Sequence, residues 1–319
     1  MTAHQMRLAL LVEGLSYAAW VAWRLGEGAA VSHALGQAVA FAFAARAAVV
    51  LLSYFFLLFA SGPVPQLLGC GPLRGLRMVV EEYVGLWLLF TVIQPFERHW
   101  LPPDELTREP ADPRQPMRPP LLLLHGYQCN RGFWFWLAPR LRRAGWTVAT
   151  HTLTPGLGSV DVQADGLDRR VREVLRATGA PKVILVGHSL GGLVARAYLR
   201  RWGAASIARV ITLGTPHYGS RLAMLAWGRC GRQMVIGNPW LRALQDEPLP
   251  VPLTSIYSVH DNQVLPQRAC SALAGATNCA IGGVSHLGMA FSPELLSVLL
   301  AVLRDDPRRP SASPVRRVR

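Results

Sequence analysis

Three long apolar segments fill the first hundred residues, and few charged positions interrupt them. They span residues 8–23, 34–60 and 78–96, each close to the roughly 20 residues that an α-helix needs to cross a bilayer. Residues 54–59 read Y-F-F-L-L-F and leave no strongly polar face on a helix. A helix that is apolar on every side is typical of a membrane span or of a deeply buried position. We therefore expect residues 1–100 to be an apolar helical region that anchors the chain in a membrane.

Charged residues near these segments suggest an orientation. Arg7 precedes the first segment, and Arg74 and Arg77 lie between the second and the third, which favours the cytoplasmic side for both loops. Three crossings would then place the rest of the chain outside the cytoplasm. Arg24 and Arg98 favour the reverse orientation. A helical domain packed on the rest of the chain is the alternative to membrane spans, whereas a cleaved signal peptide fits poorly because apolar segments recur after the first.

A change of composition separates this region from the remainder of the chain. Residues 101–119 are dense in proline and charge and cannot build a regular element, so we interpret them as a stiff linker. Residues 120–303 then form a separate domain. Residues 304–319 are basic and contain proline, and we expect this tail to be disordered.

Within residues 120–303, short aliphatic runs alternate with segments of helical periodicity. Runs that suit buried strands lie at residues 121–124, 146–153, 182–186, 209–213, 254–259 and 279–283. This alternation predicts an α/β domain with a mostly parallel central sheet flanked by helices. Residues 221–250 break it with a longer insert, which is either a cap over an apolar pocket or a helix packed on the sheet.

The third aliphatic run leads into the sequence G-H-S-L-G at residues 187–191. A strand, a sharp turn and a helix around G-x-S-x-G place the serine on a strained backbone, and the two glycines leave room for that turn. The motif also arises by chance in glycine-rich chains, so the pattern alone leaves a bystander serine as the alternative. The rest of the domain supplies the other groups that a serine nucleophile needs. Ser189 is therefore the candidate nucleophile.

A serine nucleophile needs a base, an acid that orients the base, and donors for the negative charge that develops on the substrate. After such a turn the expected chain order is serine, acid, histidine. His286 follows the last predicted strand and is the candidate base, and Asp261 follows the strand before it and is the candidate acid. Asp246, in the insert, is less well placed. The candidate oxyanion donors are the backbone N–H groups of Tyr127 and Leu190.

Composition narrows the choice of partners. The formal charge of +14 comes almost wholly from arginine, yet the arginines are scattered and match no nucleic-acid-binding motif. We therefore predict contact with anionic membrane surfaces and no nucleic-acid partner. The five cysteines contain no C-x-x-C pair, and we predict no metal site. Cys270 and Cys279 bracket a short segment, in which they are either joined by a disulfide or left as free thiols.

Several segments together resemble the α/β-hydrolase fold, and specifically bacterial lipases and esterases of the triacylglycerol lipase type. They are L-L-L-L-H-G-Y, G-H-S-L-G-G, G-T-P-H-Y-G-S, D-N-Q-V and V-S-H-L-G-M, and the resemblance covers about residues 120–303. It implies hydrolysis of a carboxylic ester or lipid through an acyl-enzyme, with Ser189, Asp261 and His286 as the triad and no cofactor. Residues 1–100 depart from the secreted lipases, which suggests an enzyme anchored in a bacterial inner membrane, with its catalytic domain on the non-cytoplasmic side.

Two other functions are compatible with the same residues. An acyltransferase or a thioesterase would use the same triad and would differ in the group that reaches or leaves the acyl-enzyme. A non-catalytic binding protein could keep the fold without turnover, but the presence of all three triad residues argues against it.

Overall fold

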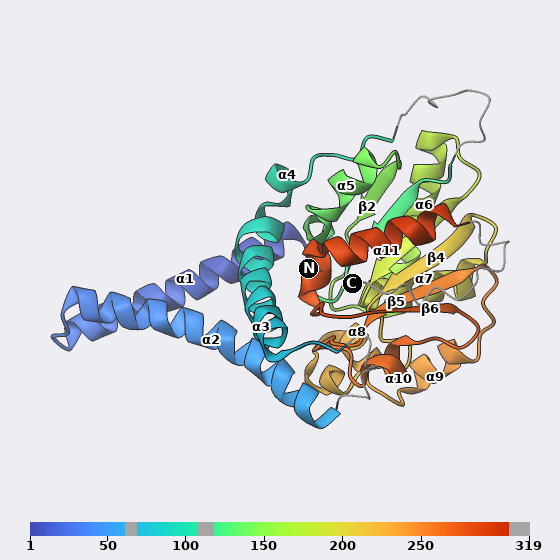
Figure 1. Ribbon diagram of the computed structural model, residues 1–319. Helices are drawn as coiled ribbons and strands as arrows, with labels where there is room; N and C mark the ends of the chain where they lie inside the picture. The colour runs from blue at the N-terminus through green and yellow to red at the C-terminus, as the bar shows by residue number, and fades with distance from the viewer. Residues whose placement is uncertain (61–68, 107–117, 306–319) are drawn as a thin grey trace.

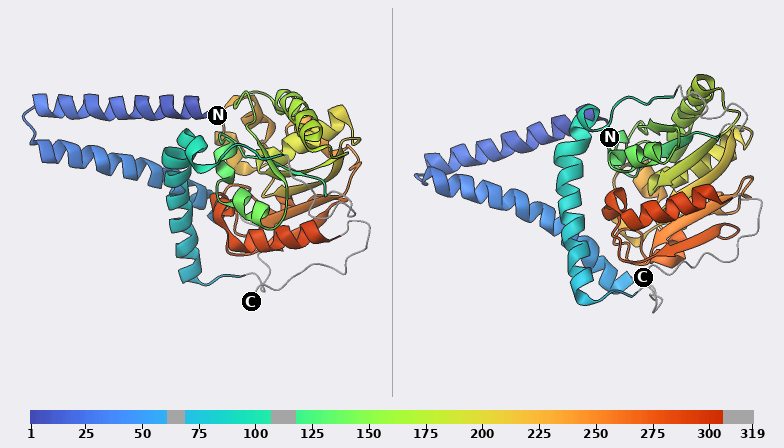
Figure 2. Two further views of the ribbon diagram at one scale, coloured as in Figure 1. Left: turned by 90° about the horizontal axis from the view of Figure 1, so that it is seen from above. Right: turned by 45° about the horizontal axis from the view of Figure 1, so that its top comes forward.

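A computed structural model of the chain describes residues 1–60, 69–106 and 118–305 (Figure 1). Most of the predicted linker, and the predicted basic tail beyond residue 305, lie outside the described residues. A layered α/β domain forms the body of the molecule, and a pair of long helices extends away from it (Figure 2).

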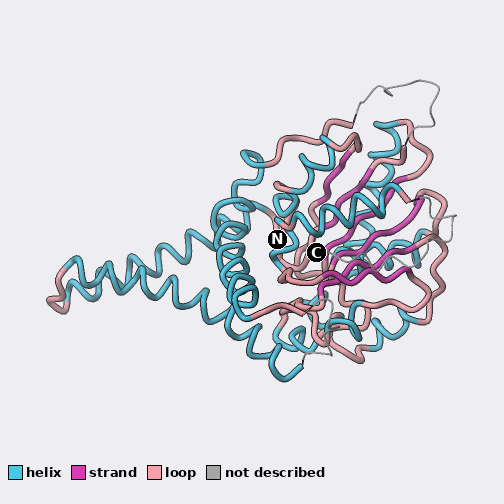
Figure 3. Tube along the Cα trace, in the orientation of Figure 1, coloured by secondary structure: helices cyan, strands magenta, loops and turns pink. Residues whose placement is uncertain are grey.

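Six parallel strands form the central sheet in the order β2-β1-β3-β4-β5-β6 (Figure 3). The strands are β1 (Leu121–Leu124), β2 (Val148–His151), β3 (Val183–His188), β4 (Ile207–Leu213), β5 (Leu253–Ser258) and β6 (Thr277–Ile281). Each overlaps one of the predicted aliphatic runs, with ends that differ by up to two residues, and the predicted parallel sheet is confirmed. Because the strands are parallel, their carboxyl ends share one edge of the sheet, where functional loops of α/β proteins gather.

Helices cover both faces of this sheet. Side chains alternate between the faces of a strand, so Leu122 and Leu124 of β1 face the core beneath α6 and α7, while Leu121 and Leu123 face the core beneath α5 and α11. The helix α11 begins after Ser292, whose hydroxyl accepts the N–H of the third helical residue. The bounds are α5 (Leu137–Arg143), α6 (Val160–Thr178), α7 (Leu190–Trp202) and α11 (Pro293–Arg304).

The insert between β4 and β5 combines both of its predicted roles. Leu241 and Leu244 of α9 pack in the core beneath α7, as a helix packed on the sheet would. The residues near position 225 instead lie over the carboxyl edge of the sheet, as a cap would. The short helices of this part are a 3-10 turn (Arg221–Leu225), α8 (Gly228–Gln233) and α9 (Pro239–Gln245), with α10 (Gln267–Ser271) following β5.

The two longest helices are α1 (Ala3–Gly26) and α2 (Val31–Ala60), which form a hairpin. Among the described residues, these are the two helices long and apolar enough to cross a membrane. Both views of Figure 2 show the hairpin extending away from the domain, with the turn between the helices at its far end. The start of α1 and the end of α2 therefore lie on the side of the domain.

The third apolar segment does not stand apart as a membrane span, and the expectation of three crossings is wrong in this respect. Leu89 and Ile93 are buried in the same core as Leu121 and Leu123 of the sheet. The domain covers one face of the segment, whereas apolar side chains on its other side, among them Val80, Val84 and Leu88, are exposed. It consists of α3 (Pro72–Trp87), a π turn (Leu88–Ile93), a 3-10 turn (Gln94–Phe96) and α4 (Glu97–Trp100).

Packing also continues across the predicted boundary between the helical region and the linker. Leu101 is fully buried in the core of the domain. The Asp104 carboxylate, itself almost completely buried, accepts the backbone N–H of Thr150 at 2.8 Å. It also forms ion pairs with three arginines of the domain, Arg131, Arg142 and Arg170. Residues 101–106 of the predicted linker are thus attached to the domain through Leu101 and Asp104.

Candidate active site

Ser189 lies in the turn between β3 and α7, with a backbone conformation that few residues adopt. Its φ is 52° and its ψ is −122°, which costs of order 1–3 kcal/mol and persists only where the surroundings enforce it. A Cβ at Gly187 would lie 2.5 Å from the backbone of Gly191, and a Cβ at Gly191 would collide with the carbonyl oxygen of Leu124. Both glycines of G-x-S-x-G are therefore required for strand, turn and helix to pack this closely.

Asp261 and His286 form a buried hydrogen-bonded pair in the loops after β5 and β6. His286 Nδ1 lies 2.8 Å from Asp261 Oδ2. The other carboxylate oxygen accepts the backbone N–H groups of Gln263 and Val264, at 2.8 and 2.9 Å. These bonds hold the carboxylate toward the imidazole. With Nδ1 engaged, Nε2 is the ring nitrogen left to exchange a proton.

Burial and neighbouring charges act in opposite directions on His286. Burial by itself lowers the pKa of an imidazole because it disfavours the charged form. The charge of Asp261, its hydrogen bond and the charge of Glu82 act the other way, and the pKa of His286 is raised above its ordinary value of 6.5. A base whose pKa lies near the working pH can both take and return a proton, as general acid–base catalysis requires.

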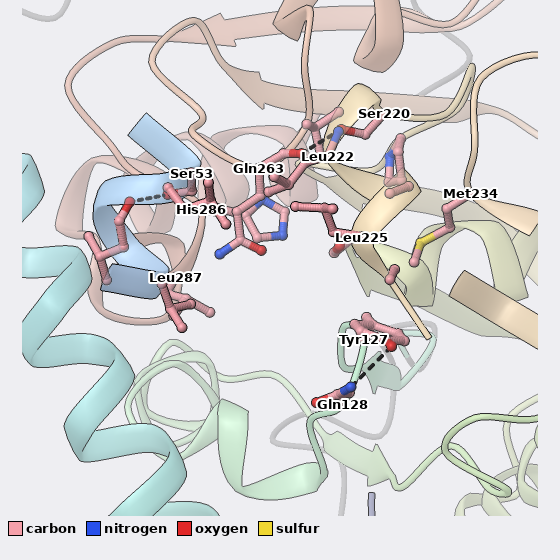
Figure 4. Close-up of a pocket in the computed structure, with 18 of the residues that line it drawn as sticks. Ser53, Tyr127, Gln128, Ser220, Leu222, Leu225, Met234, Gln263, His286 and Leu287 are labelled. Carbon is pink, nitrogen blue, oxygen red and sulfur yellow. Dashed lines mark hydrogen bonds between the residues drawn. The ribbon is translucent and has the colours of Figure 1, made fainter. Parts of the chain in front are cut away.

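A mostly apolar cavity of about 550 Å³ opens over this edge of the sheet. Ser189 and His286 both line it, so the candidate nucleophile and the candidate base face one space. Figure 4 shows His286 on one side of this space, with Tyr127 and Gln128 on the other. The insert contributes a run of apolar lining residues, Leu222, Ala223, Leu225, Ala226 and Trp227.

The loop after β1 approaches the serine closely. A Cβ at Gly126 would lie 3.1 Å from Ser189 Cβ, and the next residue, Tyr127, is in the cavity wall. The Tyr127 hydroxyl both donates to and accepts from the backbone of Trp227 at 2.8 Å, which ties this loop to the insert. Leu190 begins α7, where the first N–H groups have no partner inside the helix. Leu190 thus adjoins Ser189 in the chain, and Tyr127 follows the residue that approaches Ser189 from the loop after β1.

Three other histidines of the domain are buried and unsuited to act as the base. Burial lowers the pKa of His125 to about 3 and lowers the pKa values of His188 and His217 as well. The His188 ring lies 4.4 Å from that of Phe133 and 4.6 Å from that of His286, measured between ring centroids. His188 therefore serves as a neutral packing partner behind the candidate base.

Glu82 of α3 belongs to the site, although the sequence did not point to it. Its buried carboxylate accepts hydrogen bonds from the side chains of Asn262 and Gln263, at 3.1 and 2.9 Å, and from the backbone N–H of Leu287 at 2.9 Å. Asn262 in turn accepts the backbone N–H of His286 at 3.0 Å. One carboxylate of the helical region thus connects the loop of the candidate acid with the loop of the candidate base.

In the sequence, Glu82 is an acidic residue that interrupts an apolar segment resembling a membrane span. The signal that could have identified it is this same position, because a carboxylate inside an apolar helix needs buried polar partners. No spacing rule relates position 82 to positions 262, 263 and 287. The partners become visible only once the helix is folded onto the loops.

The same segment also braces the loop after β1. Gln94 Oε1 accepts the backbone N–H of Asn130 at 2.7 Å, and the Gln94 carbonyl accepts from the Asn130 side chain at 2.9 Å. Asn130 follows the stretch that carries Tyr127. The helical region therefore contacts both the loops of the acid–base pair and the loop of the candidate oxyanion donor.

Within residues 1–60, 69–106 and 118–305, no three His, Cys, Asp or Glu side chains are grouped as a metal site would require. Cys270 and Cys279 are free thiols. Of the two alternatives for this pair, the structure has the unbonded one.

Residues 119–274 match a protein-family model described as the alpha/beta hydrolase fold. Two curated relatives are triacylglycerol lipases, from Pseudarthrobacter phenanthrenivorans and Burkholderia plantarii, and each is 37% identical to this chain over 122 residues. The matched part is 35% of this chain and 38% and 34% of the relatives. The chain thus spans little more than a third of their length.

Among solved structures, a mature lipase of Bacillus licheniformis has a TM-score of 0.54 and 21% identity, over 61% of this chain and 96% of that one. Lipase B of Aspergillus fumigatus has a TM-score of 0.54 and 19% identity, over 60% of this chain and 54% of that one. At these identities the similarity shows the fold alone. The α/β-hydrolase fold and the resemblance to bacterial lipases and esterases are confirmed.

Proposed function

We propose that this chain, whose main domain has the α/β-hydrolase fold, is a serine hydrolase that cleaves carboxylic esters through an acyl-enzyme. One observation carries the proposal. Ser189, on a strained turn, lines the same cavity as His286, whose Nδ1 lies 2.8 Å from the buried carboxylate of Asp261. The 37% identity to two triacylglycerol lipases supports an ester or lipid as the substrate.

In the proposed reaction, the Ser189 oxygen attacks the ester carbonyl carbon while His286 Nε2 takes the hydroxyl proton. The N–H groups of Tyr127 and Leu190 stabilise the oxyanion, and Asp261 stabilises the imidazolium. The bond between the carbonyl carbon and the alcohol oxygen then breaks, and His286 gives its proton to the departing alcohol. Water, deprotonated by His286, attacks the acyl-enzyme. The acid leaves, and the proton returns to the serine oxygen.

A panel of nitrophenyl esters of increasing acyl length, assayed with the purified full chain, tests this proposal. We expect release of nitrophenol from the esters and none above background from nitrophenyl phosphate, which has the same leaving group but no carbonyl carbon. Folded protein that hydrolyses none of the esters would refute the assignment.

A membrane location is part of the proposal, because α1 and α2 are long and apolar enough to cross a bilayer. With two crossings in place of three, the chain before and after the hairpin lies on one side of the membrane. Arg7, Arg74 and Arg77 then favour the cytoplasmic side of a bacterial inner membrane for the whole domain, which reverses the side expected from three crossings. Protease digestion of the domain in inverted but not in right-side-out membrane vesicles would support this orientation, and the opposite pattern would exclude it.

Replacing Glu82 by glutamine should impair catalysis and change its pH dependence. The Glu82 carboxylate is the acceptor in all three of its hydrogen bonds. In glutamine one of the two oxygens is replaced by an NH₂ group, which donates and cannot accept. We expect kcat to fall by about 10- to 100-fold, because the loops of Asp261 and His286 lose their alignment. The charge of Glu82 raises the pKa of His286, so its removal should move the acid limb of kcat/KM to lower pH.

Two variants separate this role from a general effect on folding. Glu81→Gln alters the neighbouring carboxylate, which is more exposed and pairs with Arg77 in solvent, and it should keep the wild-type profile. Glu82→Asp keeps the charge and should retain the wild-type position of the acid limb even where kcat is reduced. An unchanged kcat and an unmoved acid limb in Glu82→Gln would exclude a positioning role for Glu82.

A further inference from the structure

One wall of the cavity is formed by a helix that lies outside the α/β domain. Four residues of α2 line it together with Ser189 and His286, and they are Val49, Val50, Leu52 and Ser53. Val50 and Ser53 are buried, and the Ser53 hydroxyl accepts a hydrogen bond from the Asn262 side chain at 2.7 Å. Figure 4 shows Ser53 on the same side of the cavity as His286. Residues 49–53 of α2 are therefore part of the candidate active site.

The rest of the same helix has no protein partner over much of its surface. Large apolar side chains of α2 are exposed on several sides, among them Val31, Leu35, Val39, Phe41 and Phe43. Exposed apolar patches of this extent mark contact with a membrane or another apolar partner. The helix α1 beside it has the same character, with Leu8, Leu11, Val12 and Leu15 exposed.

The charged residues inside the two apolar segments favour a membrane as that partner. Glu13 is the one charged residue in residues 8–23, and Arg46 is the one in residues 34–60. Their side chains pair with each other through two hydrogen bonds of 2.7 and 2.8 Å, and the Tyr17 hydroxyl also donates to Glu13. Paired charges between adjacent helices are the form in which such residues occur within bilayers.

Helix length places the cavity relative to such a bilayer. The hydrocarbon layer is about 30 Å thick, and an α-helix rises about 1.5 Å per residue. Counted from Val31 at the far end of the hairpin, about 20 residues cross this layer, so the crossing ends near Val49 and Val50. These are the residues at which α2 enters the cavity wall. The cavity thus lies at the boundary between hydrocarbon and headgroups, where lipid ester groups are located.

We propose that α2 is both a membrane-crossing helix and a wall of the substrate cavity, and that the enzyme therefore cleaves the ester of a long-chain lipid held in the same bilayer as its own hairpin. The inference rests on the proposed ester hydrolysis and adds the substrate class and its route. An acyl chain that moves along α2 passes from the bilayer into an apolar cavity without exposing its methylene groups to water, which would be unfavourable.

A reconstitution experiment with the full chain tests the route. The protein is placed in vesicles of ether-linked phosphatidylcholine, which contain no acyl ester, and dioleoylglycerol is the single long-chain ester added. In one arm the dioleoylglycerol is in the protein's own vesicles, and in the other it is in separate, protein-free vesicles. We expect release of oleate in the first arm and at most about a tenth of that rate in the second, because the chain must otherwise cross water.

Substitutions in α2 test the wall directly. Leu52→Trp and Val49→Trp place a large ring on positions that line the cavity yet are partly open, so the fold can accept it. We expect each to lower oleate release by about tenfold or more, the scale of effect that shape changes have in an apolar pocket. Leu51→Trp is the matched control, since Leu51 is as exposed as Val49 on the same helix but does not line the cavity. It should hydrolyse dioleoylglycerol as the wild type does.

Hydrolysis of nitrophenyl acetate, measured on the same samples, separates two kinds of failure. This small soluble ester should be cleaved at the wild-type rate by Leu51→Trp, and Val49→Trp and Leu52→Trp should lose at least tenfold less of this activity than of oleate release. If nitrophenyl acetate is cleaved but both vesicle arms release oleate equally, or if Leu52→Trp and Val49→Trp match Leu51→Trp, the inference is wrong and the proposed function stands. If no ester is cleaved by folded protein, the proposed function itself fails.

Discussion

Replacement of Ser189 by alanine is expected to lower kcat for nitrophenyl esters by about a million-fold, the scale seen when the nucleophile of a serine triad is removed. The reason is that the acyl-enzyme cannot form without the serine oxygen. The turn that carries Ser189 has no second hydroxyl group that His286 could activate in its place. Steady-state assays of the purified full chain measure this loss. A residual rate of about 10³- to 10⁴-fold over water is expected from the oxyanion donors and substrate binding.

The variant should fold normally, because alanine occupies less space than serine and no hydrogen bond of the structure depends on the Ser189 hydroxyl among the described residues. The contacts that this residue makes with its neighbours use its backbone, as in the bond from Thr215 to its carbonyl oxygen. An equal melting temperature in both proteins would establish that the lost activity is chemical. Retention of more than about a hundredth of wild-type kcat would show that another group is the nucleophile.

Replacement of Asp261 by asparagine is expected to lower kcat by about 10⁴-fold, because it favours the tautomer of His286 that cannot act as the base. Asp261 Oδ1 accepts two backbone N–H groups, so the amide oxygen of asparagine would take that position. The amide NH₂ would then face His286 Nδ1, which would have to accept a hydrogen bond and leave its proton on Nε2. A ring protonated at Nε2 cannot take the proton of Ser189.

Asp246→Asn is the control for this change. Asp246 is one of two adjacent acidic residues that precede β5 in the insert, and it is exposed at the end of α9. Its replacement should leave kcat and the pH profile unaltered. Nitrogen NMR of the imidazole reports the tautomer of His286 in each variant. A wild-type tautomer in an inactive Asp261→Asn protein would show that the loss of activity has a different cause.

The sequence predicts the elements that depend on local rules. Each strand is visible as a short aliphatic run, and the turn at Ser189 is visible because Gly187 and Gly191 are needed for its close packing. The parallel order of the strands brings loops that are far apart in sequence to one edge, which is why Asp261 and His286 can be chosen by their places after strands. The structure brings both of these residues together there.

What the sequence could not predict depends on contacts between distant segments. Hydropathy treats residues 78–96 as another span, because it cannot distinguish an apolar face covered by lipid from one covered by a sheet. The same limitation hides Glu82, whose partners lie about 180 to 205 positions away. It also hides Leu52, an ordinary apolar residue of α2 until the helix is placed beside Ser189. The sequence therefore predicts a helical region that only anchors the chain, whereas its helices form part of the site.

The most direct test of Ser189 as the activated nucleophile is to treat the purified full chain with a fluorophosphonate and to locate the adduct by tandem mass spectrometry. Fluorophosphonates react with serine hydroxyl groups that a neighbouring base has activated. We predict a single adduct on Ser189, formed more slowly in Asp261→Asn and absent from Ser189→Ala. An adduct on a different serine, or an unmodified Ser189 in protein that hydrolyses esters, would contradict the proposed triad.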